Sequence, residues 1–134
     1  MTEGLKVGLE LTKMYEVEKA DTAQVVKSGG LAVRATPVLL AWLEQSAFLL
    51  PELYLTDQQT TVGVQADIRH IAPTPVGMKV KVQVVLTEVT ETKLIYKTEA
   101  FDDVQKVAEG LHTRVIVDKK AFMTKVIKKK DAAK

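Results

Sequence analysis

The sequence contains no cysteine and only two histidines. Without cysteine there are no disulfide bonds, thiolate metal ligands or cysteine nucleophiles, and two histidines alone do not make a structural zinc site. The patterns GxGxxG, GK[ST], HExxH and GxSxG are also missing. These absences argue against dinucleotide-binding, P-loop, zinc-protease and α/β-hydrolase chemistry, and we expect neither a cofactor nor a metal.

Long apolar runs are missing as well. No window approaches the roughly 20 uninterrupted apolar residues of a membrane-spanning helix, and residues 1–10 lack a basic segment followed by an apolar one. We therefore predict a soluble cytoplasmic protein without a membrane partner. The formal net charge is only +2, with much of the excess in residues 124–134. A solvated chain end explains this charge better than an arm that binds nucleic acid, so no nucleic-acid partner is expected.

The chain of 134 residues is long enough for one domain with a real core and too short for two. It has no internal repeat, linker or low-complexity block. We predict a single domain over residues 1–134, in which residues from about 128 to 134 form a flexible basic tail.

The N-terminal part predicts a strand followed by a short helix. Residues 5–17 alternate well enough for a strand. In the segment that follows, Asp21 is expected to cap a short helix, which Gly29 and Gly30 would end.

The stretch ATPVLLAWLEQSAFLL, residues 35–50, predicts a long apolar helix. Thr36 is a permitted N-cap residue, Pro37 suits the first helical turn, and Pro51 is expected to end the helix. Apolar side chains occupy so many positions that we expect the helix to be enclosed on most sides. These side chains are Leu39, Leu40, Trp42, Leu43, Ala47, Phe48 and Leu50.

From Thr60 onward the hydrophobic period changes to two. The first strand is expected to present one face made of Val62, Val64, Ala66, Ile68 and His70. After a bend at residues 72–77, residues 78–89, 92–102 and 107–118 predict three more strands. Asp118 then caps a closing helix, whose apolar stripe consists of Phe122, Met123, Val126 and Ile127.

This order of elements predicts an α+β protein. We expect the four later strands to form an antiparallel meander and, with the first strand, a five-stranded antiparallel sheet wrapped around the central helix, which is the hot dog architecture. Such a sheet has exposed edges, which a second copy of the chain commonly covers. We therefore expect a dimer.

Glu44 is the only charged residue in the long apolar helix. An ionised carboxylate is rarely buried without a partner, because the unpaired charge is costly. Glu44 is therefore either a structural carboxylate, bonded to backbone amides or to a buried cation, or a general base or nucleophile tuned by its apolar surroundings. The pattern by itself leaves both possibilities open.

Two further polar residues are candidates for the same site. His70 falls on the apolar face of its strand, toward the helix, where it is either a satisfied core histidine or a partner of Glu44 in one site. Thr36 is either a simple N-cap or a group that positions a carbonyl oxygen near the unpaired amides of the helix start. Two unusual inward polar groups facing one space favour a site.

Three segments, residues 36–48, 62–77 and 109–122, together resemble the fluoroacetyl-CoA thioesterase-like branch of the hot dog thioesterases, and the similarity spans nearly the full length. In that branch a threonine, a glutamate eight residues later and a histidine 26 residues further form the catalytic set. Thr36, Glu44 and His70 keep this spacing. The resemblance implies an acyl-CoA substrate and a site at the interface of a homodimer or larger assembly.

The resemblance also suggests residues that bind the substrate. Gly63 would let the thioester approach the backbone closely. His112 and Arg114 resemble family positions and have a supporting role, although Arg114 is also explained as an exposed or ion-paired strand residue. A small acyl pocket is expected beside Trp42 and Val64, with Leu39 as a further boundary.

Three functions are compatible with these sequence features. The leading hypothesis is an acyl-CoA thioesterase that converts a short or small acyl-CoA thioester to a carboxylate and free CoA. The alternative is a hot dog protein that binds an acyl-CoA or similar ligand without turnover, and a weaker one is an interaction domain whose dimer is its whole function. Because a pure binder needs no base, the set Thr36, Glu44 and His70 favours catalysis.

Overall fold

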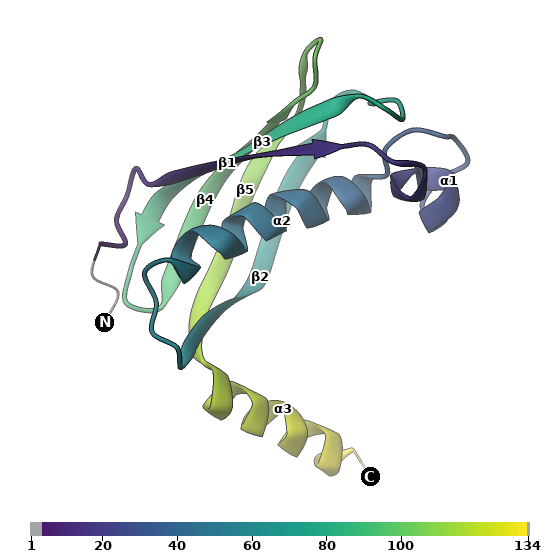
Figure 1. The fold of residues 1–134 in the computed structure, drawn as a ribbon. Coiled ribbons are helices and arrows are strands. Elements are labelled where there is room, and N and C mark those ends of the chain that lie inside the picture. Colours follow the sequence, from purple (N-terminus) through teal and green to yellow (C-terminus); the bar gives the residue numbers. More distant parts are fainter. Residues whose placement is uncertain (1–3, 134) are drawn as a thin grey trace.

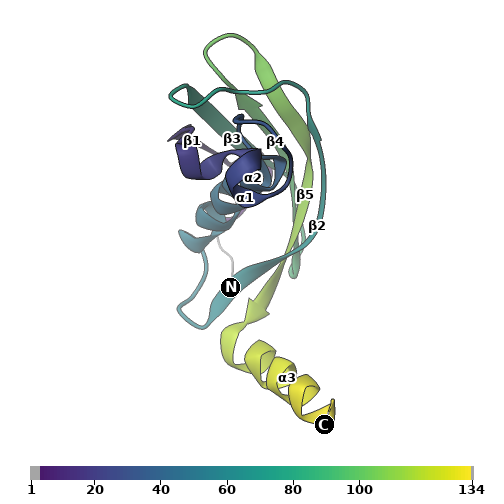
Figure 2. The same cartoon turned by 90° about the vertical axis from the view of Figure 1, so that its right-hand side faces the viewer.

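The computed structural model describes residues 4–133, which form one curved antiparallel sheet with a long helix along its concave face (Figures 1 and 2). The predicted α+β arrangement of five strands around a central helix is confirmed. The strands are β1 (Glu10–Glu16), β2 (Gln59–His70), β3 (Lys79–Val89), β4 (Lys93–Phe101) and β5 (Lys106–Asp118), and the central helix is α2 (Thr36–Glu52).

The sheet order is β1-β3-β4-β5-β2, which corrects the predicted meander. Strands β3, β4 and β5 are successive antiparallel neighbours, but β2 pairs with β5 rather than with the β3 that follows it. Alternation of apolar residues gives a strand its faces but not its neighbour, so the sequence pattern did not decide this point. The two edges of the sheet are consequently β1 and β2.

One face of α2 supplies much of the core. Leu39, Leu43, Ala47 and Leu50 are at most 3% exposed and pack in two clusters with side chains of β3, β4 and β5. The opposite face is open: Ala41, Glu44 and Gln45 are exposed, as are Thr36 and Pro37 at the helix start. The prediction of a helix enclosed on most sides is therefore wrong for the single chain, because the sheet covers only one side of it.

The predicted helix boundaries need small corrections. Ala35 is the N-cap of α2 and Thr36 is its first residue, so the Thr36 hydroxyl does not cap the helix. Pro51 lies in the last turn, which ends at Glu52. Thr22, rather than Asp21, caps the N-terminus of the short helix α1 (Ala23–Val26). Its C-cap residue is Lys27, in the left-handed conformation, and not the glycine pair. Asp21 is the last residue of the preceding 3-10 helix η1 (Lys19–Asp21).

A β-bulge divides β2 into two halves. Gly63 lies opposite Arg114 and Gln65 lies opposite Thr113, so Val64 is the extra residue between them. An extra residue reverses the alternation of faces. The helix-facing positions are therefore Thr61 and Gly63 before the bulge and Ala66, Ile68 and His70 after it. The prediction that Val62 and Val64 share a face with these last three is wrong for this reason.

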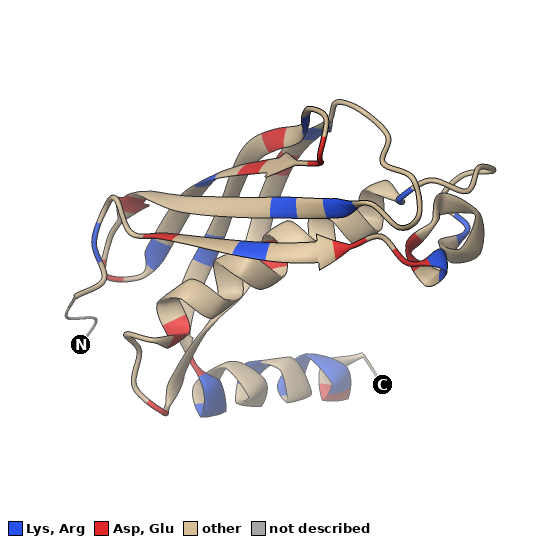
Figure 3. Cartoon of the chain, turned by 45° about the horizontal axis from the view of Figure 1, so that its top comes forward, with Lys and Arg blue, Asp and Glu red and all other residues tan. Residues whose placement is uncertain are grey.

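The closing helix α3 (Lys119–Ala132) projects from the body of the sheet and carries most of the lysines at the chain end (Figures 1 and 3). As predicted, Asp118 caps it, accepting a hydrogen bond from the Ala121 amide at 2.8 Å. Of the predicted apolar stripe, Met123 and Ile127 are about half exposed. Residues 128–132, placed in the predicted tail, continue the helix, while Lys134 lies outside the described residues. None of the helices in residues 4–133 has the length and apolar character needed to cross a bilayer.

Candidate active site

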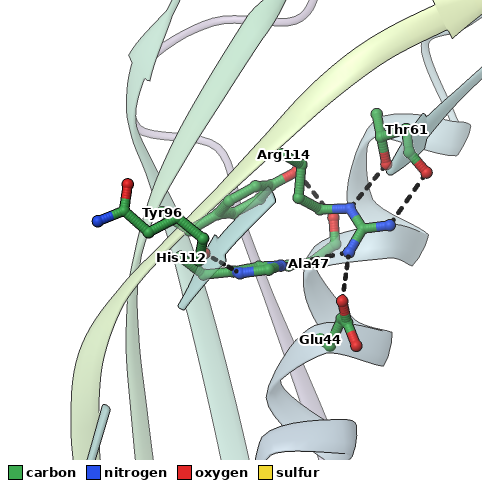
Figure 4. A network of polar contacts seen from close by, with 7 residues as sticks. Glu44, Ala47, Thr61, Tyr96, His112 and Arg114 are labelled. Carbon is green, nitrogen blue, oxygen red and sulfur yellow. Dashed lines mark hydrogen bonds and ion pairs between the residues drawn. The ribbon is translucent and has the colours of Figure 1, made fainter. Parts of the chain in front are cut away.

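Glu44 has a charged partner. Its Oε2 lies 3.4 Å from Nη1 of Arg114, which comes from the middle of β5 (Figure 4). The arginine side chain is 6% exposed, whereas that of Glu44 is 47% exposed. The Glu44 carboxylate is thus held by a buried arginine on one side and is exposed to solvent on the other, where a ligand could reach it.

Arg114 is fixed mainly by residues other than Glu44. Its Nε donates to Thr61 Oγ1 at 2.8 Å, and its Nη2 donates to the Thr61 carbonyl at 3.0 Å. Its Nη1 also faces His112 Nε2 at 3.2 Å (Figure 4). Burial lowers the pKa of Arg114, and the negative charge of Glu44 opposes this change. Because a guanidinium is planar and only donates hydrogen bonds, these contacts fix its orientation.

Gly63 gives the carboxylate its space. A Cβ atom at this position would overlap Oε2 of Glu44 and lie 3.2 Å from a ring carbon of His112 and 3.3 Å from Nη1 of Arg114. The backbone of Gly63 is not in the left-handed region, so the requirement for glycine comes from this close approach alone. Glu44, Gly63, His112 and Arg114 form what we call the carboxylate cluster.

His70 and Thr36 meet in a second group. The His70 Nδ1 atom lies 2.7 Å from Thr36 Oγ1. On the other side of the ring, Nε2 lies 3.4 Å from Nη2 of the buried Arg34. Burial, followed by the charge of Arg34, lowers the pKa of His70, so the imidazole is neutral near pH 7. Thr36, His70 and Arg34 form what we call the hydroxyl cluster.

The two clusters are separate within one chain. Thr36 and Glu44 are eight residues apart on α2, which corresponds to about 12 Å of axial rise. Among the polar contacts of residues 4–133, none joins Glu44 to Thr36 or His70. The fold therefore brings Thr36 to His70, and Glu44 to Gly63, His112 and Arg114, but does not join the predicted set directly in a single chain.

The predicted walls of an acyl pocket are placed differently. Leu39 is fully buried in the core, and Val64, at the bulge, is 56% exposed. Trp42 is half-buried, with its ring stacked on Tyr15 at 4.7 Å and the Arg34 guanidinium 5.4 Å from its centre. Trp42 thus lies beside the hydroxyl cluster.

Two residues of the site were missed in the sequence: Arg34 of the hydroxyl cluster, and Thr61, which binds Arg114 of the carboxylate cluster. Thr61 is one of several threonines and carries no distinguishing signal. Arg34 stands in a short segment before the helix, where nothing in the pattern indicates burial. Arg114 was recognised, and the structure supports its ion-paired interpretation. A charged residue on the inward face of an alternating strand was the available signal for it.

No group of three or more His, Asp or Glu side chains in the part of the chain that the structure describes is arranged to hold a metal ion. The two clusters bring together a carboxylate, a hydroxyl, two imidazoles and two guanidinium groups.

The free energy of unfolding should depend on pH through the two histidines. Burial is the main reason that the pKa values of His70 and His112 both lie below 6.5, the ordinary value that they regain on unfolding. As the pH falls below about 6.5, the unfolded chain binds protons before the folded chain does, so stability should fall until the folded-state pKa values are passed. Urea denaturation over a pH series measures this loss. Replacing both histidines with glutamine should flatten the curve in this window, and an unchanged slope would contradict the assignment.

Comparison with known proteins identifies relatives of this arrangement. The family model of the fluoroacetyl-CoA-specific thioesterase FlK matches residues 17–120. A fluoroacetyl-CoA thioesterase of Streptantibioticus cattleyicolor is 27% identical over 138 residues, which cover 98% of this chain and 99% of the relative.

Solved structures agree. A structure of the fluoroacetyl-CoA thioesterase FlK superposes with a TM-score of 0.90 at 25% identity, covering 95% of this chain and 98% of that one. A hot-dog-like protein from Thermanaerovibrio acidaminovorans superposes with a TM-score of 0.85 at 24% identity, covering 92% and 91% of the two chains. The latter likeness concerns the fold alone, and it confirms the predicted hot dog architecture.

Proposed function

The chain belongs to the fluoroacetyl-CoA-specific thioesterase family, and from that premise we propose that it hydrolyses the thioester of a short or small acyl-CoA to a carboxylate and free CoA. The observation that supports this most is Glu44, an accessible carboxylate oriented by a buried arginine next to a glycine that leaves its oxygen uncovered. A protein that only bound its ligand would have no need of a held base at this place.

In the proposed reaction, Glu44 either attacks the thioester carbonyl carbon, giving an anhydride that water then opens, or removes a proton from the water that attacks. In both routes the carbon–sulfur bond breaks, the thiolate leaves and receives a proton, and one water molecule is consumed. Arg114 is held by Thr61 and His112, and its Nη1 orients the carboxylate of Glu44.

Thr36 is proposed to position the thioester carbonyl. Its hydroxyl stands at the first residue of α2, is exposed and does not cap the helix. The unpaired amides and positive dipole end of a helix start suit an oxygen that gains negative charge. His70 lies against this hydroxyl at 2.7 Å, so within one chain the group that it orients is Thr36.

The enzyme is proposed to work as a homodimer. Edge strand β2 carries the bulge, and both Thr36 and Glu44 are open to solvent beside it in the single chain. A second copy at this edge would pair the free backbone groups of β2 and exclude water from the carboxylate. It would also supply a second hydroxyl cluster and carboxylate cluster close to those of the first chain.

Light scattering should therefore give a mass of at least twice the 14.8 kDa of the chain at micromolar protein concentration. The physical reason is the unpaired edge of β2 together with the exposed side of α2. A monomer at that concentration would contradict both the edge argument and the proposed location of the site. Replacing a β2 residue whose backbone amide faces away from β5 with proline should weaken the assembly, because that amide could no longer donate to a second copy. Proline in the exposed segment before α2 should leave the assembly unchanged.

The function itself is tested by thiol release from a panel of acyl-CoAs, run beside calorimetric binding of the same panel. We expect release with acetyl-like and short branched acyl groups and much slower release with long chains, because the Trp42 ring, stacked on Tyr15 beside the hydroxyl cluster, would bound the acyl group. Binding without release would favour the alternative, a hot dog protein that binds acyl-CoA without turnover. Preferential hydrolysis of palmitoyl-CoA would contradict the chain-length prediction and leave the thioesterase assignment standing.

A further inference from the structure

Arg34 is an unusual residue of this fold. It precedes α2, its side chain is 1% exposed, and within residues 4–133 it is among the largest fully buried side chains. Within residues 4–133, its Nε and Nη1 atoms have no hydrogen-bond partner. In this part of the chain, Nη2 alone has an acceptor, which is Nε2 of His70 at 3.4 Å. The buried guanidinium therefore donates to one acceptor among the described residues, His70 of the hydroxyl cluster.

The cost of this arrangement calls for a function. A guanidinium without full pairing loses much of its favourable hydration free energy when it is buried. Its compensation is modest: the Trp42 ring lies 5.4 Å away, and Asp102 attracts it through space. Burial lowers the pKa of Arg34 to about 10, so it is still a cation at neutral pH. An apolar side chain would fill the same space without the desolvation cost, so the contribution of arginine lies in its contact with His70.

That contact has a defined polarity. A guanidinium has five N–H donors and no acceptor. His70 Nε2 meets Arg34 favourably only when it presents its lone pair, because a proton there would face both an N–H group and a positive charge. The proton of the neutral ring then belongs on Nδ1, which donates to Thr36 Oγ1 at 2.7 Å. With its oxygen occupied as an acceptor, the Thr36 hydroxyl keeps its own proton for another partner.

We propose that Arg34 is a positioning residue: it holds His70 in the neutral tautomer with the proton on Nδ1, and thereby makes the exposed Thr36 hydroxyl a hydrogen-bond donor toward the thioester carbonyl oxygen. The last clause rests on the proposed function, whereas the tautomer is a property of the free protein. The alternative is the opposite polarity, in which Thr36 donates to Nδ1 and His70 acts as its base.

His112 provides an internal reference for this assignment. Its Nδ1 lies 2.8 Å from the Gln65 carbonyl oxygen, and its Nε2 lies 3.2 Å from Nη1 of Arg114. A carbonyl only accepts and a guanidinium only donates, so both neighbours place the proton of the neutral His112 ring on Nδ1. The same arrangement, with an arginine against Nε2 and an oxygen against Nδ1, thus occurs at both histidines of the chain.

The test is long-range ¹H–¹⁵N correlation of the full-length protein labelled in its two histidines, recorded without substrate at a pH where both rings are neutral. We expect both imidazoles to show a protonated Nδ1 and an unprotonated Nε2. In Arg34→Met, which keeps much of the volume but no donor, His70 should change toward protonation at Nε2 and His112 should not. Arg34→Lys keeps a cation that only donates and should retain the wild-type pattern. A wild-type His70 protonated at Nε2, or a pattern unchanged by Arg34→Met, would overturn the proposal.

Kinetics add a second readout. Arg34→Met should lower kcat for the best acyl-CoA by about 10-fold or more, less than the loss of roughly 100-fold or more that follows deletion of an oxyanion donor. In a Thr36→Val background the same change should have little further effect, because Arg34 acts through the threonine hydroxyl. Full additivity would contradict that route. If the wild type releases no thiol, the proposed function fails while the tautomer is still read from the spectra. If Arg34→Met does not fold, the wild-type spectrum and Arg34→Lys decide the matter.

Discussion

Glu44→Gln should lower acyl-CoA turnover by at least about 100-fold, the usual scale for loss of a positioned acid or base. Glutamine keeps the size of the side chain and one acceptor oxygen toward Arg114, but it neither attacks a carbonyl as a carboxylate does nor accepts a proton from water. Binding of acyl-CoA should persist. Thiol release and calorimetry on the same preparation measure both quantities.

The same change should cost little stability. Glu44 is 47% exposed, and the contact with Arg114 is 3.4 Å long, so removing the charge should lower the free energy of unfolding by no more than about 1 kcal/mol. Arg114 keeps its bonds to Thr61 and its contact with His112. A large loss of stability with full turnover would refute the catalytic role and make Glu44 a structural residue.

Glu52→Gln is a matched control for this experiment. Glu52 lies on the same helix and accepts a hydrogen bond from Thr60 at 3.0 Å, which glutamine also accepts. Turnover should be unchanged in this variant. Equal losses in Glu44→Gln and Glu52→Gln would show that the general negative charge of α2, and not a carboxylate at one position, supports the reaction.

Gly63→Ala should reduce turnover by up to about 100-fold, because a displacement of about 1 Å in a reacting group has an effect of that size. The new methyl group would occupy the place of Glu44 Oε2 and press against His112 and Arg114. Since Glu44 is open to solvent on its other side, it can move outward, and the chain should still fold. We expect kcat to fall while the far-ultraviolet circular dichroism spectrum is retained.

Gly30→Ala is the corresponding control, because a Cβ atom there meets nothing within 4 Å and the backbone is not left-handed. Its turnover and melting temperature should stay close to those of the wild type. Full activity in Gly63→Ala would mean that the observed position of the Glu44 carboxylate is not the reactive one.

Local sequence patterns predicted most of the helices and strands and the candidate chemistry of the site. The helix predicted over residues 35–50 corresponds to α2 (Thr36–Glu52), period-two alternation marks the later strands, and Asp118 caps the closing helix. Local rules suffice for these features, since capping, hydrophobic period and turn residues act over a few positions. The spacing of Thr36, Glu44 and His70 in the sequence also supports the family and the activity.

Tertiary structure alone decided the pairing of these elements and therefore the contacts of the site. Strand β2 lies at the edge of the sheet beside β5, which places Gly63 opposite Arg114. Arg114 in turn forms the ion pair with Glu44. The bulge at Val64 changes which residues face the helix, and the burial of Arg34 puts a charge against His70. Each of these depends on which distant segment lies alongside. The same alternation of apolar residues is compatible with many strand pairings, and only the free energy of the assembled core selects one of them.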